Sequence, residues 1–272
     1  MKRFAVFVMC LMMGLMLFVS GCGGSQPAQQ GGKGGEAAEI KAIKDRGVLK
    51  VGVKVDVPKF GYKDPLTNKI DGLEIDIARA MAKKVLGDET KLELLPVTAK
   101  TRGALLDNGE IDMAIASFTV TDERKKSYNF TDPYVTDHIG FMVKKSSGMK
   151  SLKDMNGKKI GVAQSATARR DLQAEADKLG IKVQFLEFGS HPEIKTALDS
   201  GRVDVYGGDV SILSGYIDDS VVILEDRYSP QRNAVGLKKS NEALTKLATE
   251  TIVDMEKSGE LKKLIQKWNI TL

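Results

Sequence analysis

The sequence contains few residues of the kinds that usually form metal sites or disulfides: two cysteines and two histidines in 272 residues. His138 and His191 do not have the spacing of a metal site, and no cluster of cysteine and histidine is present. A Gly-rich phosphate loop and a nucleophile elbow are also missing. We therefore expect a protein without metal, cofactor or catalytic residues.

Long apolar runs are scarce as well, since the sequence has one, at residues 4–19. The run follows Lys2 and Arg3 and is short for a bilayer span, which favours a signal peptide. It ends in VSGC (19–22), which resembles the lipobox of bacterial lipoproteins, where Cys22 would become the acylated first residue. A simple signal peptide, or an uncleaved anchor with an incidental cysteine, is the alternative. Cleavage would remove Cys10 and leave Cys22 alone, so no intrachain disulfide would form.

A large excess of one charge is missing too. The formal net charge is +5, and loss of Lys2 and Arg3 with the signal peptide would leave +3, without a polybasic block. Such a mild excess does not indicate binding to nucleic acid. A Gly- and Gln-rich stretch without apolar periodicity follows Cys22 and predicts a flexible tether. We place the signal peptide at 1–21 and the tether at 22–38, and the remainder is long enough for two lobes.

The remainder alternates segments that are typical of strands and of helices. Residues 48–53 and 92–97 predict strands, and residues 73–85 place apolar side chains at helical spacing. Another helix, at 101–108, precedes a strand at 111–116. This order is typical of βαβ units and predicts an α/β fold with mainly parallel sheets flanked by helices.

A weak internal repeat indicates two related lobes. ALLDNGEIDMA (104–114) is echoed by TALDSGRVDVY (196–206), so that helix, glycine and strand recur together. The strand at 48–53 is likewise echoed at 158–163. The chain therefore contains two related α/β units.

Two short apolar strands that end in basic pairs, at 139–145 and 234–239, bracket the second unit and are candidate hinge crossings. We predict a first lobe at 39–141 and 235–272, and a second lobe at 142–234. Ligands bind beyond the carboxyl ends of the strands in open α/β sheets, so two facing lobes would form a cleft there.

Three motifs carry a resemblance to a known family: SFTVTDER (117–124), YNFTDPY (128–134) and GGD (207–209). They resemble segments of the polar amino-acid-binding proteins of ABC transporters, solute-binding protein family 3. The resemblance implies a two-lobed periplasmic-binding-protein-like fold with two hinge crossings. It also implies an extracytoplasmic protein that hands an amino acid to an ABC transporter permease. Lys54 and Arg102 are most similar to the aspartate/glutamate-binding branch.

The chemistry of these positions can be considered on its own. A free amino acid carries a carboxylate and an ammonium on one carbon, and burying either charge unpaired is costly. Arg124 is suited to the carboxylate because its planar guanidinium can donate two parallel hydrogen bonds, and Ser117 and Thr119 alternate on one strand end beside it. Asp209, at the corresponding strand end of the second lobe, is suited to the ammonium. With one charge on each lobe, closure would complete the site.

Lys54 and Arg102 add two cations near Arg124. They would repel one another unless an anion binds, and the side-chain carboxylate of glutamate or aspartate would supply it. An isolated lysine or arginine is more often exposed to solvent, so the resemblance contributes much of this expectation. Glutamine is the alternative ligand, because an amide would be satisfied by the same donors.

Further residues are candidates for contact with the ligand. Phe60 follows the first strand and would cover the aliphatic part of the ligand, or pack within its own loop. Tyr206 and His191 are expected at the edge of the cleft, although an aromatic residue on a strand usually belongs to the core. Thr167 lies in QSATA (164–168), which departs from the commoner Gly-containing version of this loop.

Two other classes of protein compete with this interpretation. Some periplasmic dehydratases and cell-wall lytic enzymes share the architecture, and one acid in the cleft, or His191, would suffice for general-acid chemistry. The ligand-binding half of a sensor would need a spanning helix and a signalling segment. We expect instead a monomeric, lipid-anchored binding protein without catalytic residues, attached to the membrane through Cys22.

Overall fold

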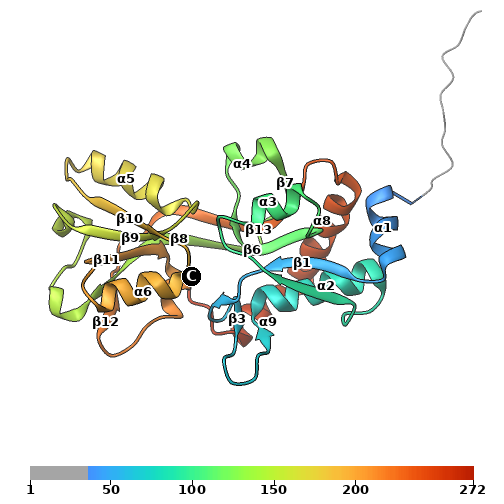
Figure 1. Ribbon diagram of the computed structural model, residues 1–272, viewed down its shortest axis with the longest axis horizontal. Helices are drawn as coiled ribbons and strands as arrows, with labels where there is room; N and C mark the ends of the chain where they lie inside the picture. Colours follow the sequence, from blue (N-terminus) through green and yellow to red (C-terminus); the bar gives the residue numbers. More distant parts are fainter. Residues whose placement is uncertain (1–35) are drawn as a thin grey trace, which may run out of the picture. The chain divides into compact units, whose positions relative to one another are not determined.

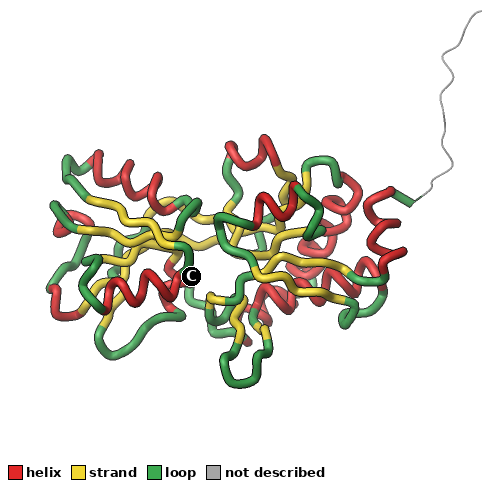
Figure 2. Tube along the Cα trace, viewed as in Figure 1, coloured by secondary structure: helices red, strands yellow, loops and turns green. Residues whose placement is uncertain are grey.

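The computed structural model describes residues 36–272; the predicted signal peptide, Cys22 and the tether up to residue 35 lie outside the described residues. Residues 36–272 form two α/β lobes joined by two long strands, β8 (Val135–Lys144) and β13 (Tyr228–Lys238) (Figure 1). Helices lie on both sides of the strands in each lobe (Figure 2). The predicted two-lobed α/β fold is therefore confirmed.

The first lobe is built from the start and the end of the described chain. Its elements are α1 (Ala38–Arg46), β1 (Leu49–Val53), β2 (Asp56–Val57), β3 (Gly61–Lys63), β4 (Ile70–Asp71), α2 (Leu73–Leu86), β5 (Leu92–Pro96), α3 (Arg102–Asp107), β6 (Met113–Thr119), α4 (Asp122–Ser127), β7 (Tyr128–Phe130), α8 (Glu242–Lys257) and α9 (Glu260–Lys267). The two final helices return to this lobe after β13, as the sequence predicts.

The second lobe lies between the two long strands. Its elements are the 3-10 turns η1 (Lys145–Ser147) and η2 (Leu152–Met155), followed by β9 (Lys159–Ala163), α5 (Ala168–Lys178), β10 (Gln184–Phe188), α6 (His191–Asp199), β11 (Val205–Asp209), α7 (Val210–Ser214) and β12 (Val221–Ile223). The repeat in the sequence corresponds to α3 and β6 in one lobe and to α6 and β11 in the other.

One sheet extends through both lobes, in the order β10-β9-β11-β8-β13-β6-β1-β5. The strands at each end are parallel: β1 pairs with β5 and β6, and β9 pairs with β10 and β11. The two long strands pair antiparallel with each other and with the neighbouring strand of each lobe. Each lobe therefore has a parallel sheet whose carboxyl ends face the junction between the lobes.

The long strands exchange partners where they cross between the lobes. In β8, Val135 to Ile139 pair with β13, and from Ile139 onward β8 pairs with β11. In β13, the partner changes from β8 to β6 at Asn233. The predicted crossings lie in these same two strands, and the predicted lobe boundaries at residues 142 and 234 stay a prediction.

Helix α2 illustrates how the sequence determines an element that positions the site. Its apolar face, with Ile77 and Met81 buried in the core, packs on β1 and β6. Acidic residues lie in its first turn and lysines in its last, which complements the helix dipole. It ends at Gly87 in the left-handed conformation, so the predicted helix at 73–85 is confirmed to within one residue.

The connection between β1 and α2 contains the small sheet β2-β3-β4 and is closely packed. A Cβ atom at Gly61 would lie 2.3 Å from the carbonyl oxygen of Lys54, and one at Gly72 would lie 2.2 Å from the carbonyl oxygen of Phe60. Only glycine allows such an approach of backbone to backbone. The close packing fixes the segment that carries Lys54 and Asp56 against the rest of the first lobe.

Candidate binding site between the two lobes

A small pocket lies where the strand ends of the two lobes meet, which is the place where open α/β sheets commonly bind small molecules. The first lobe contributes residues just after β1, at the end of β6 and at the starts of α3 and α4, and the second lobe contributes residues around β9, β11 and α6. The lining includes eight of the ten predicted ligand contacts: Lys54, Arg102, Ser117, Thr119, Arg124, Thr167, His191 and Asp209. The topology therefore gathers most of the candidates, although their contact with a ligand stays a prediction.

Arg124 reaches from the first lobe to the second. Thr121 caps α4 by accepting a hydrogen bond from the Arg124 N–H, which fixes the start of the short helix. The guanidinium donates to the carbonyl oxygen of Thr119 at 2.7 Å and to that of Ser165, in the second lobe, at 3.0 Å. Burial, together with the nearby charge of Arg170, lowers the pKa of Arg124 to about 10, which still leaves it charged at neutral pH.

Arg102 begins α3 and is almost completely buried, at 3% exposure. It stacks over Phe118 at 4.0 Å and donates to the carbonyl oxygens of Ala116 and Ser117. Its Nε atom has no hydrogen-bond partner among residues 36–272. Burial and the nearby charge of Arg124 lower the pKa of Arg102 to about 9, so an anion near it would be favourable.

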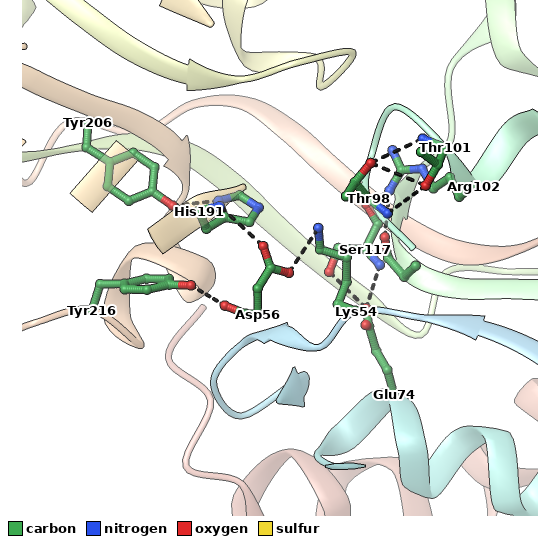
Figure 3. A network of polar contacts seen from close by, with 11 residues as sticks. Lys54, Asp56, Glu74, Thr98, Thr101, Arg102, Ser117, His191, Tyr206 and Tyr216 are labelled. Atoms are coloured by element: carbon green, nitrogen blue, oxygen red, sulfur yellow. Dashed lines mark hydrogen bonds and ion pairs between the residues drawn. The ribbon is translucent and has the colours of Figure 1, made fainter. Parts of the chain in front are cut away.

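Lys54 follows β1 and is also 3% exposed. Its ammonium lies 3.2 Å from a carboxylate oxygen of Asp56, as Figure 3 shows. Burial lowers the pKa of Lys54, and the charge of Asp56 opposes that shift. The pair favours the charged form of a buried lysine that lines the pocket.

Ser117 and Thr119, on β6, are held by other polar groups. Ser117 has a φ of 49°, in the left-handed region, and both its N–H (2.6 Å) and its hydroxyl (2.9 Å) donate to Glu74 Oε1. Thr119 donates to the side-chain oxygen of Asn233 at 3.1 Å. Both hydroxyl groups line the pocket but keep only their lone pairs for a ligand.

Asp209 ends β11 and is the acidic residue that lines this pocket among the described residues. Burial and the charge of Asp137 raise the pKa of Asp209 to about 7. Asn233 Nδ2 is 3.4 Å from its Oδ2 atom. A cation in the pocket would favour the charged form of this carboxylate.

The remaining candidates from the second lobe differ in their positions. His191 is buried at the start of α6, and its Nδ1 atom lies 2.5 Å from the hydroxyl of Tyr206 (Figure 3). Burial, together with the charge of Lys54, lowers the pKa of His191 to about 3, so its ring is neutral at physiological pH. Thr167 donates to Gln231 at 2.6 Å, which ties its loop to β13.

Two predicted contacts do not line the pocket. Phe60 is completely buried in the core of the first lobe, which fits the alternative that it packs within its own loop; its contact with a ligand stays a prediction. Tyr206 lies in the core of the second lobe, and its hydroxyl is hydrogen-bonded to the ring of His191. Both aromatic residues are excluded from water by apolar neighbours, which is the usual position for such residues on or beside strands.

Sequence reasoning missed three polar residues around the pocket. Asp56 pairs with Lys54, Glu74 accepts three hydrogen bonds beneath Ser117, and the hydroxyl of Tyr216 donates to the backbone carbonyl of Asp56. Asp56 had a detectable signal, because it lies two positions after Lys54, and side chains at this spacing on an extended segment point to one side. Glu74 and Tyr216 are far from their partners in sequence, and no local pattern identifies them.

Neither a metal site nor a membrane span is found in the part of the chain that the structure describes. Residues 36–272 contain no group of three or more potential metal ligands. None of the helices in this range combines the length and the apolar character needed to cross a bilayer. Cys22 and the predicted lipid anchor lie outside the described residues.

Comparison with known proteins extends these observations. The chain is 36% identical over 266 residues to a glutamine-binding protein of Geobacillus stearothermophilus, covering 92% of this chain and 100% of that protein. It is 32% identical to the ABC transporter glutamine-binding protein GlnH of Bacillus subtilis strain 168, covering 93% of this chain and 92% of the relative. A solved structure of an ancestral arginine-binding protein bound to arginine matches with a TM-score of 0.74 and 34% identity, covering 82% of this chain and 98% of that one.

A family model matches residues 49–271, which is nearly all of the described chain. The match includes both lobes, both crossing strands and every residue that lines the pocket. The chain belongs to family 3 of the bacterial extracellular solute-binding proteins.

Proposed function

We propose that this protein captures an acidic amino acid, glutamate or aspartate, between its two lobes and delivers it to an ABC importer. The observation that carries the proposal is the charge of the pocket. Lys54, Arg102 and Arg124 line it together, whereas Asp209 is the acidic residue among its described lining. An amino acid with a second carboxylate is the ligand that matches three cations and one anion.

Each charge of such a ligand has a partner in this arrangement. Arg124 would hold the α-carboxylate and Asp209 the ammonium, one from each lobe. The side-chain carboxylate would then lie near Arg102 and Lys54, which are both about 3% exposed. A buried cation without an anion is costly, so a neutral side chain would leave part of this charge uncompensated.

Glutamine is the second candidate, and the comparisons support it better than they support an acidic ligand. Both curated relatives described above are named for binding glutamine. The pocket also offers a reason, because Asp56 already pairs with Lys54 at 3.2 Å and offsets one of the three cations. An amide oxygen would still accept a hydrogen bond from Arg102.

The comparisons also support the importer and the location, whereas the proposed anchor rests on the sequence around Cys22. The family is extracellular and one relative is the binding protein of an ABC transporter, which supports an extracytoplasmic protein that works with a permease. Lipidation of Cys22 would hold it at the membrane as a monomer. A dehydratase on the same fold is the weaker alternative, because the relatives described above are named as binding proteins.

Calorimetric titration of the processed protein with glutamate, aspartate, glutamine and arginine tests the proposal. We expect glutamate or aspartate to bind at least about tenfold more tightly than glutamine, a difference of about 1.4 kcal/mol. Tighter binding of glutamine would reject the acidic ligand and establish the second candidate. Turnover of a prephenate-like substrate in the same sample would instead favour the enzyme.

A further inference from the structure

Asp56 makes contacts with both lobes although it does not line the pocket. Within the first lobe, its Oδ1 atom lies 3.2 Å from the ammonium of Lys54. Toward the second lobe, its Oδ2 atom accepts a hydrogen bond of 3.2 Å from the backbone N–H of His191. Its backbone carbonyl accepts another from the hydroxyl of Tyr216. Figure 3 shows the carboxylate between Lys54 and His191.

The contact with the second lobe is part of a wider direct junction. Ile212, on α7, packs in the apolar core of the first lobe, and Tyr216 contacts the cores of both lobes. Lys59 donates to the hydroxyl of Ser214, also on α7, at 3.1 Å. Asp56 and Lys59 therefore both bond the second lobe, but only Asp56 also bonds a residue that lines the pocket.

We propose that Asp56 is a positioning residue that couples recognition of the ligand's side chain, through Lys54, to closure of the lobes, through His191 and Tyr216. When the lobes separate, the carboxylate loses its partners in the second lobe. The carboxylate beside Lys54 is then more hydrated and held less rigidly. The position and charge of Lys54 at the end of the ligand's side chain therefore depend on closure. The inference builds on the proposed binding site and takes glutamate as its probe.

The electrostatics of the pair agree with this role. Lys54 is buried, and burial lowers its pKa, while the charge of Asp56 raises it. Burial acts against ionisation of Asp56, but the charge of Lys54 and the hydrogen bond from the His191 N–H outweigh it, so the pKa of Asp56 lies below its usual value. Each member of the pair therefore favours the charged form of the other. Removing the charge of Asp56 would leave Lys54 less able to remain an ammonium.

A double-mutant cycle with glutamate titration tests the coupling to Lys54. Asp56→Asn preserves the shape of the side chain and leaves the backbone bond to Tyr216. We expect it to weaken glutamate binding roughly tenfold in the wild-type background but less than about twofold in Lys54→Met. Lys59→Met removes a different bond between the lobes and is the matched control. Its effect should be the same factor in both backgrounds.

A second variant tests the contact with the other lobe. Asp56→Ala also removes the acceptor for the His191 N–H, so it should still weaken binding roughly fivefold in the Lys54→Met background. Equal effects of Asp56→Asn in both backgrounds would overturn the coupling to Lys54. A silent Asp56→Ala in the Lys54→Met background would overturn the coupling to closure.

Two controls keep these outcomes separate from other failures. The melting temperature of each variant identifies loss of folding, which would lower binding in both backgrounds alike. If the wild-type protein binds glutamine in preference to glutamate, the acidic-ligand proposal fails, and the same cycle with glutamine as the probe still decides the role of Asp56.

Discussion

Replacing Arg102 with methionine separates recognition of an acidic side chain from recognition of amino acids in general. The aliphatic part of methionine can still pack on Phe118, over which the guanidinium now stacks at 4.0 Å. The charge disappears, together with the hydrogen bonds to the carbonyl oxygens of Ala116 and Ser117. The substitution thus removes the charge and keeps an unbranched apolar side chain at this buried position.

The expected magnitudes follow from the burial of Arg102. Removing one member of a buried ion pair costs about 3–5 kcal/mol, and Lys54, which remains beside the ligand, reduces this to about 2–3 kcal/mol for glutamate. A neutral amide loses one hydrogen bond, worth about 1 kcal/mol. Glutamate should therefore bind about 30- to 150-fold more weakly and glutamine about fivefold more weakly. The ratio of the two affinities should fall by at least about fivefold.

Calorimetric titration of the wild-type and variant proteins with both ligands gives this ratio directly. Loss of the bonds to the two carbonyl oxygens acts on both ligands alike, so the ratio is insensitive to it. Lys100→Met is the matched control, because Lys100 is exposed beside α3 and should leave both affinities unchanged. Equal weakening of glutamate and glutamine by Arg102→Met would refute the acidic-ligand assignment.

Three further predictions concern other groups. Because burial and Asp137 raise the pKa of Asp209 to about 7, and an ammonium binds its charged form, affinity should be constant above about pH 7 and fall about tenfold per unit below it; calorimetry that shows no such slope would contradict this role. Burial raises the pKa of Glu74, which shows that its charged form is costly where it lies. Glu74→Gln removes this charge and keeps an acceptor for Ser117 and Tyr134, so the melting temperature at pH 8 should not fall. Cys22→Ser should release the protein from membranes with unchanged ligand affinity; membrane fractionation measures this, and a variant that stays in the membrane fraction would contradict lipidation.

Much of the fold can be predicted because its signals are local. Apolar spacing and flanking glycines predict α2 within one residue, and the repeat in the sequence predicts the second lobe. Strand β6 extends to Thr119, beyond the predicted 111–116, because it pairs with β13 from the far end of the chain. Helix α1 (Ala38–Arg46) is absent from the prediction, since Ile43 gains its burial only by packing against distant elements.

In the site, too, the residues that can be predicted are those with a local signal in the sequence. Residues that end strands or begin helices, such as Arg124 and Asp209, can be recognised because the sheet brings strand ends together. The position of Phe60 does not follow from the sequence, because an aromatic side chain in a loop points either to a ligand or to the core. The structure places it in the core, beside the close backbone contacts of Gly61 and Gly72. Glu74 is invisible in the sequence, since its partner Ser117 is 43 residues away.

Similarity along the whole chain and charge within the pocket answer different questions about the ligand. The identity of 36% to a glutamine-binding protein is distributed over 266 residues, most of which do not line the pocket. The choice between an amide and a carboxylate depends on the few charges near the ligand's side chain, which include Lys54 and its partner Asp56. A substitution at one such position can change the affinity for a ligand by about tenfold while leaving the overall sequence identity almost unchanged. The pocket therefore has to be tested by substitution of its charges, because the name of a relative does not determine them.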